Sequence, residues 1–185
     1  MTQRGIGHFV SMRLFIAIDL PENIKAYLSE LQQKLPQAQM SLARDFHLTL
    51  KFLGECDEDK MREVAQELDQ IKIPPFKAKL GQIGTFGGFP PKVVWIRLDV
   101  PQFLFDTARE IEKKMLPLGF KEENRFVPHL TLCRVKSVPN PQKFLDALKL
   151  IKVSPMEFSV SQFHLIESHL SESGAVYKKI ASCSD

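Results

Sequence analysis

The chain has 185 residues, of which 44% are hydrophobic and 25% charged, and its formal net charge is +3. This length suits one compact domain with a sizeable core, and the composition is that of an ordinary globular protein. No block of Lys or Arg resembles a nucleic-acid-binding arm, so the mild positive charge permits an anionic ligand without predicting one. The three cysteines, at positions 56, 133 and 183, are odd in number and form no C-x-x-C. They argue against a disulfide framework or a zinc site and favour a reducing compartment, so we expect a cytoplasmic protein.

The first residues carry no hydrophobic pattern, and a second methionine stands at position 12. We expect a loose N-terminal extension over residues 1–11, followed by a single domain over residues 12–185. The apolar run at 14–18 is too short for a signal or membrane-spanning segment, and Asp19 closes it. We therefore expect no membrane attachment.

Two stretches of the chain open in the same way, RLFIAIDLP at 13–21 and VVWIRLDVP at 93–101, 80 residues later. Each predicts a strand followed by a proline at the start of a helix. The apolar positions of the two predicted helices repeat at the same offset, as Ile24, Leu28, Leu31 and Leu35 and then Leu104, Ala108, Ile111 and Met115. This spacing places each set on one helical face.

The later elements also repeat, at an offset close to 82. They are the tetrapeptides HLTL (47–50 and 129–132), second helices (about 58–71 and 141–151), and strands that begin with Phe76 (FKAKLGQI) and Phe158 (FSVSQFHLI). The segment GTFGGFPPK at 84–92 is expected to join two antiparallel strands. The order predicts two pseudo-repeats, about 12–92 and 93–181. We therefore expect an α+β fold: a bilobal pseudo-two-fold duplication in which two antiparallel β-sheets flank a central cleft and helices pack on the outside.

The HLTL strands carry the candidate chemistry. Side chains alternate along a strand, so His47, Thr49 and Lys51 are expected on one face and the two leucines on the other. His129 and Thr131 stand in the same relation in the second half. If the leucines pack on helices, a two-fold relation brings two histidines and two threonines together across the cleft, which makes a concave site with four polar groups.

Two facing imidazoles suit acid–base catalysis near neutral pH, because one can accept a proton while the other donates one. Threonine hydroxyls are good donors to an anionic oxygen, and Arg134, five residues after His129, could pair with a phosphate oxygen. Together these groups indicate in-line attack at phosphorus. The alternatives are two structural histidines, or a metal site that lacks an evident third ligand. No G-x-S-x-G or P-loop motif is present.

The paired H-x-T-x segments resemble the signature of the 2H phosphoesterase superfamily. Four stretches, MRLFIAIDLP, HLTLKFLGE, VPHLTLCRVK and LIESHLSESGAVYKKI, resemble one branch of it, the RNA 2′,3′-cyclic phosphodiesterases, also called 2′-5′ RNA ligases or LigT-like proteins. The resemblance runs from about Met12 to Ile180. One H-x-T-x is a weak signal, whereas two copies with these flanks are specific.

The resemblance implies an enzyme with no metal or cofactor that acts on RNA ends carrying a 2′,3′-cyclic phosphate, such as tRNA halves or oligonucleotides. Water opens the ring with the 3′ oxygen as leaving group, which leaves a 2′-phosphomonoester. The reverse type of reaction, joining such an end to a 5′-hydroxyl through a 2′-5′ bond, also occurs in the family without ATP. We expect a monomer with no obligate protein partner.

The resemblance also implies roles for six residues: His47 as proton donor, His129 as proton acceptor, Thr49, Thr131 and Arg134 as phosphate-binding groups, and Phe52 as a stacking platform for a base. The near symmetry of the motifs leaves the choice of acid and base open, and Phe52 could instead be a core residue. Two other functions stay open. One is a nucleotide- or RNA-binding module without turnover, and the other is a phosphodiesterase for small cyclic phosphates or 2′-5′ oligonucleotides.

Overall fold

The computed structural model describes residues 11–123, 125–171 and 174–184. Within them the elements run β1 (Met12–Asp19), α1 (Glu22–Gln32), β2 (Gln39–Leu42), β3 (His47–Cys56), α2 (Glu58–Leu68), β4 (Phe76–Phe86), β5 (Val93–Asp99), α3 (Gln102–Met115), the 3₁₀ turn η1 (Leu116–Leu118), β6 (His129–Ser137), α4 (Pro141–Leu150), β7 (Glu157–Val160), β8 (Gln162–Ser171) and β9 (Gly174–Ser184). The predicted extension lies almost wholly outside the described residues, and the boundaries of the two pseudo-repeats stay a prediction.

The four predicted helices are present, because apolar spacing and local capping both favour them. The side chain of Asp57 accepts a hydrogen bond from the Lys60 backbone at the start of α2, and Asn140 caps α4 on the Lys143 backbone in the same way. A proline precedes the first residue of α1 and of α3, as the sequence predicted. Helices α2 and α4 end at Leu68 and Leu150, slightly earlier than expected.

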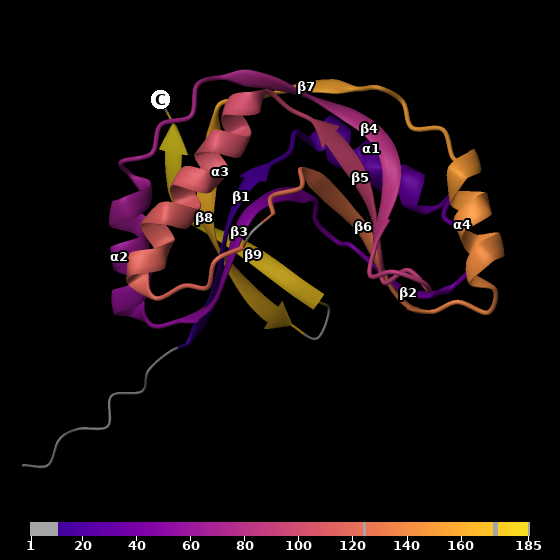
Figure 1. The fold of residues 1–185 in the computed structure, drawn as a ribbon, viewed down its shortest axis with the longest axis horizontal. Coiled ribbons are helices and arrows are strands. Elements are labelled where there is room, and N and C mark those ends of the chain that lie inside the picture. Colours follow the sequence, from indigo (N-terminus) through magenta and orange to yellow (C-terminus); the bar gives the residue numbers. More distant parts are fainter. Residues whose placement is uncertain (1–10, 124, 172–173, 185) are drawn as a thin grey trace, which may run out of the picture.

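Two antiparallel sheets face each other, which confirms the predicted fold class (Figure 1). The first has the strand order β3-β1-β8-β9 and the second the order β2-β6-β5-β4-β7. Each predicted repeat contributes to both sheets: β1 and β3 lie in the four-stranded sheet, but β2 and β4 lie in the five-stranded one. The repeats are therefore interlocked rather than side by side.

The strand predicted to begin at Phe158 is in fact two strands, so that expectation was wrong. Residues 157–160 form β7, which pairs with β4 in the five-stranded sheet. After Ser161 the chain continues as β8, which pairs with β1 in the other sheet. Residues 157–160 alternate between exposed and buried positions and residues 163–167 are all buried, so the pattern gave no sign of a break, and the partners available on either side of Ser161 divide the two strands.

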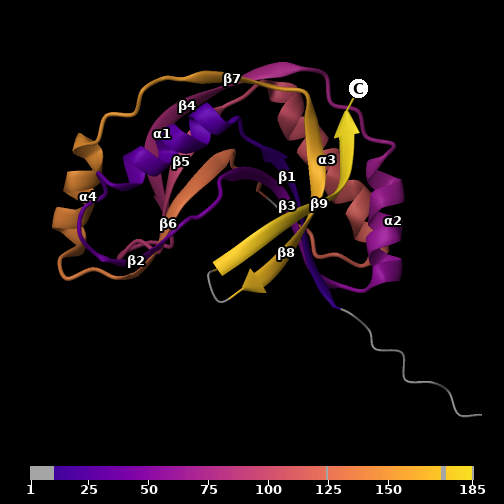
Figure 2. The ribbon, with the colours of Figure 1, turned by 180° about the vertical axis from the view of Figure 1, so that it is seen from behind.

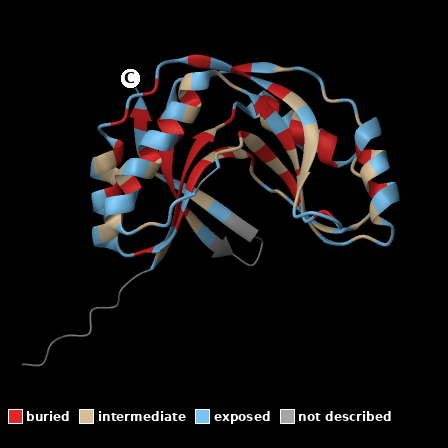
Figure 3. Ribbon diagram, viewed as in Figure 1, coloured by how far each residue is buried: buried red, intermediate tan, exposed pale blue. Residues whose placement is uncertain are grey.

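The helices pack on the outer faces of the two sheets. Helices α2 and α3 lie on the side of the four-stranded sheet, and α1 and α4 on the side of the five-stranded sheet (Figures 1 and 2). Figure 3 shows the buried residues on the strands and on the helix faces turned toward them. One buried side chain ties α1 to the second motif strand, since Gln32 Nε2 donates to the carbonyl oxygen of Leu132 at 2.7 Å. No helix in the described ranges is long and apolar enough to cross a membrane.

Candidate active site

The first motif strand contains a β-bulge at the last residue of HLTL. In the pairing of β3 with β1, Thr49 lies opposite Ala17 and Lys51 opposite Ile16, so that Leu50 has no separate partner. The extra residue reverses the alternation from that point. Lys51 is therefore buried, with 1% of its surface exposed, and the prediction that it shares the face of His47 was wrong.

The second motif strand has the same bulge at the equivalent place. Thr131 lies opposite Trp95 and Cys133 opposite Val94, which leaves Leu132 as the extra residue. Cys133 is fully buried and Arg134 is exposed. In each motif strand the bulge places the fifth residue after the histidine, Phe52 or Arg134, outside the core.

One cavity of about 420 Å³ gathers all six residues for which the family resemblance implies roles: His47, Thr49, Phe52, His129, Thr131 and Arg134. The first three come from β3 and the others from β6, so the two motif strands form opposite walls. Buried leucines lie on the other side of each motif strand, as predicted from the alternation. The structure thus places two imidazoles, two hydroxyls, one guanidinium and one aromatic ring around a single space.

His129 is held by its own backbone and by two aromatic rings. Its Nδ1 lies 2.7 Å from the carbonyl oxygen of Val127. A carbonyl only accepts, so Nδ1 carries the proton, and the neutral ring keeps its lone pair on Nε2. The rings of Phe86 and Trp95 lie at centroid distances of 5.0 Å and 5.8 Å. Burial lowers the pKa of His129 below its usual value, although the bond to Val127 opposes that change.

His47 lies in a more enclosed place. Its ring contacts Phe15 at a centroid distance of 4.8 Å and Tyr177 at 5.2 Å. Its Nδ1 is buried and has no hydrogen-bond partner among the described residues. Burial lowers the pKa of His47 to about 4, although the carboxylates of Asp45 and Asp19 act in the opposite direction. His47 is therefore neutral at pH 7 in the free protein.

A charged network lies beside His47. Lys25 Nζ is 2.8 Å from Asp19 Oδ1 and 3.4 Å from Asp45 Oδ1, and Lys179 Nζ is 2.7 Å from Asp19 Oδ2. Burial alone would raise the pKa of Asp19, but the hydrogen bonds from Lys179 and Lys25 outweigh it and lower that pKa to about 2. The network therefore keeps the Asp19 carboxylate ionised near His47.

The family model for LigT-like phosphoesterases matches residues 18–95 and 98–177, and each matched segment contains one HLTL motif. The two segments include most of the chain. The chain belongs to the LigT-like phosphoesterase family.

Several relatives of this LigT-like phosphoesterase have names that state an activity. An RNA 2′,3′-cyclic phosphodiesterase of Methanocaldococcus jannaschii is 40% identical over 173 residues, which are 91% of this chain and 98% of that protein. One from Thermotoga maritima is 34% identical over 180 residues, with 93% and 95% covered. Among solved structures, E. coli LigT complexed with 3′-AMP matches with a TM-score of 0.76 at 26% identity, covering 94% of this chain and 98% of LigT.

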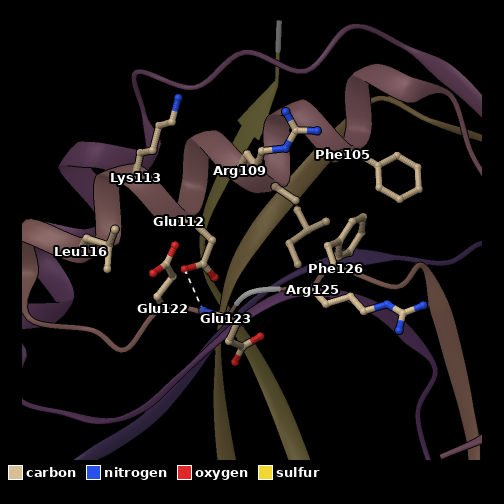
Figure 4. Close-up of a pocket in the computed structure, with 11 residues that line it drawn as sticks. Phe105, Arg109, Glu112, Lys113, Leu116, Glu122, Glu123, Arg125 and Phe126 are labelled. Carbon is tan, nitrogen blue, oxygen red and sulfur yellow. Dashed lines mark hydrogen bonds between the residues drawn. The ribbon is translucent and has the colours of Figure 1, made fainter.

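In this LigT-like phosphoesterase the buried Lys51 joins the two repeats. Its Nζ donates to Glu112 Oε1 at 2.7 Å and to the carbonyl oxygen of Lys121 at 2.9 Å. Figure 4 shows Glu112 on α3, where its Oε2 accepts a bond of 3.3 Å from the backbone nitrogen of Glu123. The pair therefore connects the bulge of β3 to a helix from the second repeat and to the segment that precedes β6.

Several residues of the cavity wall were not predicted from the sequence: Ser41, Leu42, Ala43, Arg44, Asp45, Phe86, Val93 and Tyr177. A signal for Tyr177 was present, because AVYKKI repeats VVWIRL and so aligns Tyr177 with Trp95. Those two residues contact His47 and His129 respectively. No comparable pattern pointed to the segment at 41–45, which reaches the site because β2 pairs with β6.

In the ranges that the structure describes, no group of three or more His, Cys, Asp or Glu side chains is arranged to hold a metal ion. The three cysteines, Cys56, Cys133 and Cys183, are unpaired and buried.

Proposed function

We propose that this LigT-like phosphoesterase hydrolyses RNA ends that carry a 2′,3′-cyclic phosphate and releases 2′-phosphomonoesters. The observation that carries the proposal is the convergence of both H-x-T-x motifs and Arg134 on one cavity. The names of the relatives from M. jannaschii and T. maritima support the substrate. The crystal structures of E. coli LigT complexed with 3′-AMP and with phosphate support a nucleotide phosphate as the ligand.

In the proposed reaction His129 is the base. Its Nδ1–H is bonded to the Val127 carbonyl, so Nε2 is free to accept a proton from water. The water oxygen forms a bond to phosphorus while the bond from phosphorus to the 3′ oxygen breaks. His47 donates its proton to that oxygen, so each histidine ends the step in the opposite protonation state.

His47 must be protonated before it can act as the acid. Burial holds it neutral in the free protein, whereas Asp45 and Asp19 favour its charged form. An anionic cyclic phosphate in the same cavity adds negative charge and raises the pKa of His47 further. The substrate itself therefore promotes the protonation that the reaction needs.

Thr49, Thr131 and Arg134 are the proposed ligands of the non-bridging phosphate oxygens. Hydroxyl and guanidinium donors that are fixed by strands stabilise the charge that develops in the transition state. Phe52, which is 55% exposed at the cavity wall, offers a face on which the terminal base can stack. These groups and the histidines need no metal or other cofactor. The same groups serve 2′-5′ ligation with the acid and base roles exchanged.

We further propose a monomeric, cytoplasmic protein, in keeping with three unpaired buried cysteines.

The decisive experiment is incubation of the purified protein with a short RNA ending in 2′,3′-cyclic phosphate, in the presence of EDTA. A 2′-phosphate product is expected, with His47→Ala and His129→Ala reducing the rate by about 10²-fold or more. A 3′-phosphate product or fully active variants would refute the mechanism.

Two other outcomes separate the competing functions. Tight binding of a 2′-nucleotide with no turnover of any cyclic phosphate supports a binding module. Turnover of a small cyclic phosphate or a 2′-5′ dinucleotide, without turnover of the RNA end, supports a phosphodiesterase with a different substrate.

A further inference from the structure

One edge of the cavity is built from three segments that contain no Asp or Glu. The segments are residues 33–44, 86–93 and 133–140, and we call them the carboxylate-free edge. Their charged residues are all basic: Lys34, Arg44, Lys92, Arg134 and Lys136. In the whole chain 25 basic residues stand against 22 acidic ones, so this edge is far more positive than the rest of the molecule.

The three segments lie together although they are far apart in sequence. β2 pairs with the end of β6, with Ser41 opposite Arg134 and Gln39 opposite Ser137. The loop between β4 and β5 lies on the other side of β6, where the Val135 backbone nitrogen donates to the Lys92 carbonyl oxygen at 2.8 Å. The edge is continuous with the cavity, because each segment also contributes to its wall, through Ser41, Leu42, Ala43, Arg44, Phe86, Val93 and Arg134.

The basic residues of this edge form no ion pairs within the described ranges, and Asp45, which directly follows Arg44 on the cavity wall, pairs with Lys25 instead. All five basic side chains are exposed, and none forms an ion pair with a carboxylate of the described residues. The basic residues beside His47 differ, since Lys25 and Lys179 both bind Asp19. Unpaired cations along one wall of a cleft attract a polyanion to that wall.

The same edge offers apolar and uncharged surface to nucleobases. Phe89, in the loop between β4 and β5, is 66% exposed, and Leu42 is 43% exposed at the cavity. Beyond Leu42 lies a groove of about 710 Å³ whose lining residues, from the end of α1, β2 and the end of β6, are all uncharged. Proteins bind single-stranded nucleic acid with this combination of a basic track and stacking surfaces.

A second groove, which shares Phe52 with the cavity, has a different character. Phe52 also lines a groove of about 550 Å³ toward α2 and η1, and that groove carries Glu55, Asp57 and Glu123 beside two lysines. A phosphodiester backbone would meet more negative than positive charge there.

We propose that the RNA chain leading to the reacting end lies along the carboxylate-free edge, with its phosphates on Lys136 and Lys92 and its bases toward Leu42 and Phe89. The inference rests on the proposed function, since it extends the path of the same substrate. Under this proposal the protein also recognises the single-stranded RNA that precedes the cyclic phosphate. Binding of the terminal nucleotide itself depends on the cavity alone.

The test compares two substrates, a nucleoside 2′,3′-cyclic phosphate and a ten-nucleotide RNA with the same cyclic end. The variant Lys92→Gln/Lys136→Gln alters neither histidine nor any cavity side chain named above. Its kcat/KM on the RNA should fall by about tenfold, while its kcat/KM on the mononucleotide should change less than twofold. In a plot of the logarithm of the RNA binding constant against the logarithm of the salt concentration, each lost phosphate contact reduces the magnitude of the slope by about 0.7. The double variant loses two such contacts, so the magnitude of its slope should fall by about 1.4. Lys149→Gln, at an exposed lysine of α4 on the outer side of the same sheet, is the matched control and should behave as the unmodified protein.

Equal losses on both substrates, or an unchanged kcat/KM on the RNA, would overturn the proposed path. Failure of the proposed function is a separate result, in which the unmodified protein hydrolyses neither substrate. Fluorescence anisotropy with the same RNA bearing a 2′-phosphate end then still tests the edge, because the double variant should bind it more weakly than the control does. Weak RNA binding that none of these lysines affects, together with tight binding of an acidic peptide, would assign the edge to a protein partner instead.

Discussion

Phe52 and Arg134 occupy equivalent places in the two motif strands, each five residues after its histidine and each directly after a bulge. Both side chains line the active-site cavity. The duplicated scaffold thus holds an aromatic ring on one wall and a guanidinium on the other. This difference between matching positions makes the two walls unlike, and in the proposed binding mode a nucleotide that stacks on Phe52 directs its phosphate toward Arg134.

Replacing Phe52 by Ala tests that directional arrangement. Loss of a stacking face costs roughly 1–3 kcal/mol per base, so KM for a nucleoside 2′,3′-cyclic phosphate should rise at least about fivefold with kcat little changed. A ribose 2′,3′-cyclic phosphate without a base is the matched control substrate and should show no such rise. Steady-state kinetics measure KM for both substrates. An equal rise in KM for the two would show that Phe52 has a structural role only.

Gly84 leaves room for the indole of Trp95, which lies against His129. A Cβ at Gly84 would fall 2.4 Å from two carbons of that ring, so Gly84→Ala must displace the ring. We expect a loss of about 1–3 kcal/mol in stability and a lower kcat. Gly81→Ala is the comparison in the same strand, because its Cβ would lie 3.3 Å from the Cβ and the backbone oxygen of Arg97, so that Arg97 must shift slightly but the Trp95 ring need not move. Trp95 is the sole tryptophan, so its fluorescence reports the displacement, and unchanged emission would contradict this account.

The buried pair of Lys51 and Glu112 should behave as a unit. Lys51→Met leaves the Glu112 carboxylate without its partner and should cost about 3–5 kcal/mol in the free energy of unfolding, whereas Lys51→Met/Glu112→Leu should recover much of it. Lys114→Met, which removes a more exposed pair with Glu67, should cost at most about 1 kcal/mol. Urea titrations measure all three. A double variant as unstable as the single one would mean that the pair has no mutual dependence.

The low pKa of His47 predicts a dependence of stability on pH. The folded protein releases its proton at a pKa of about 4, whereas an unfolded histidine does so near its ordinary value of 6.5. The unfolded state therefore binds more protons between these values, and the free energy of unfolding falls as pH drops from 6.5 to 4, by up to about 3 kcal/mol. His47→Gln should lose that part of the dependence in urea titrations at pH 7 and pH 4.5. Equal pH dependence in the two proteins would argue against a neutral buried His47.

The catalytic rate should also depend on pH, because the reaction uses both histidines. Burial lowers the pKa of both histidines in the free protein, so kcat/KM should reach its maximum below pH 6.5. The bound phosphate favours protonated His47, so the maximum of kcat should lie at higher pH. Measurements of kcat and kcat/KM against pH with EDTA present test both expectations. Maxima of kcat and kcat/KM at the same pH would show that the charge of the bound phosphate does not change the pKa of His47.

The order and type of most elements could be predicted from this sequence, because each half repeats the same apolar spacing and the same Pro-initiated helices. The placement of His and Thr on the same face of each motif strand could also be predicted, because alternation along a short strand is a local property. The prediction failed at Lys51 and at Ser161. A bulge depends on how one strand meets its neighbour, and the change of sheet at Ser161 depends on which strand edges are open.

Local patterns are enough to predict two H-x-T-x strands whose leucines pack inward. The surroundings of these strands depend on contacts between distant parts of the chain. The bulges turn Phe52 and Arg134 into the cavity and bury Lys51 against Glu112. The pairing of β2 with β6 adds Arg44 and Ser41 to the wall. The physical reason is that side-chain direction in a strand follows from local alternation, whereas register, bulges and sheet membership follow from backbone hydrogen bonds to segments distant in sequence.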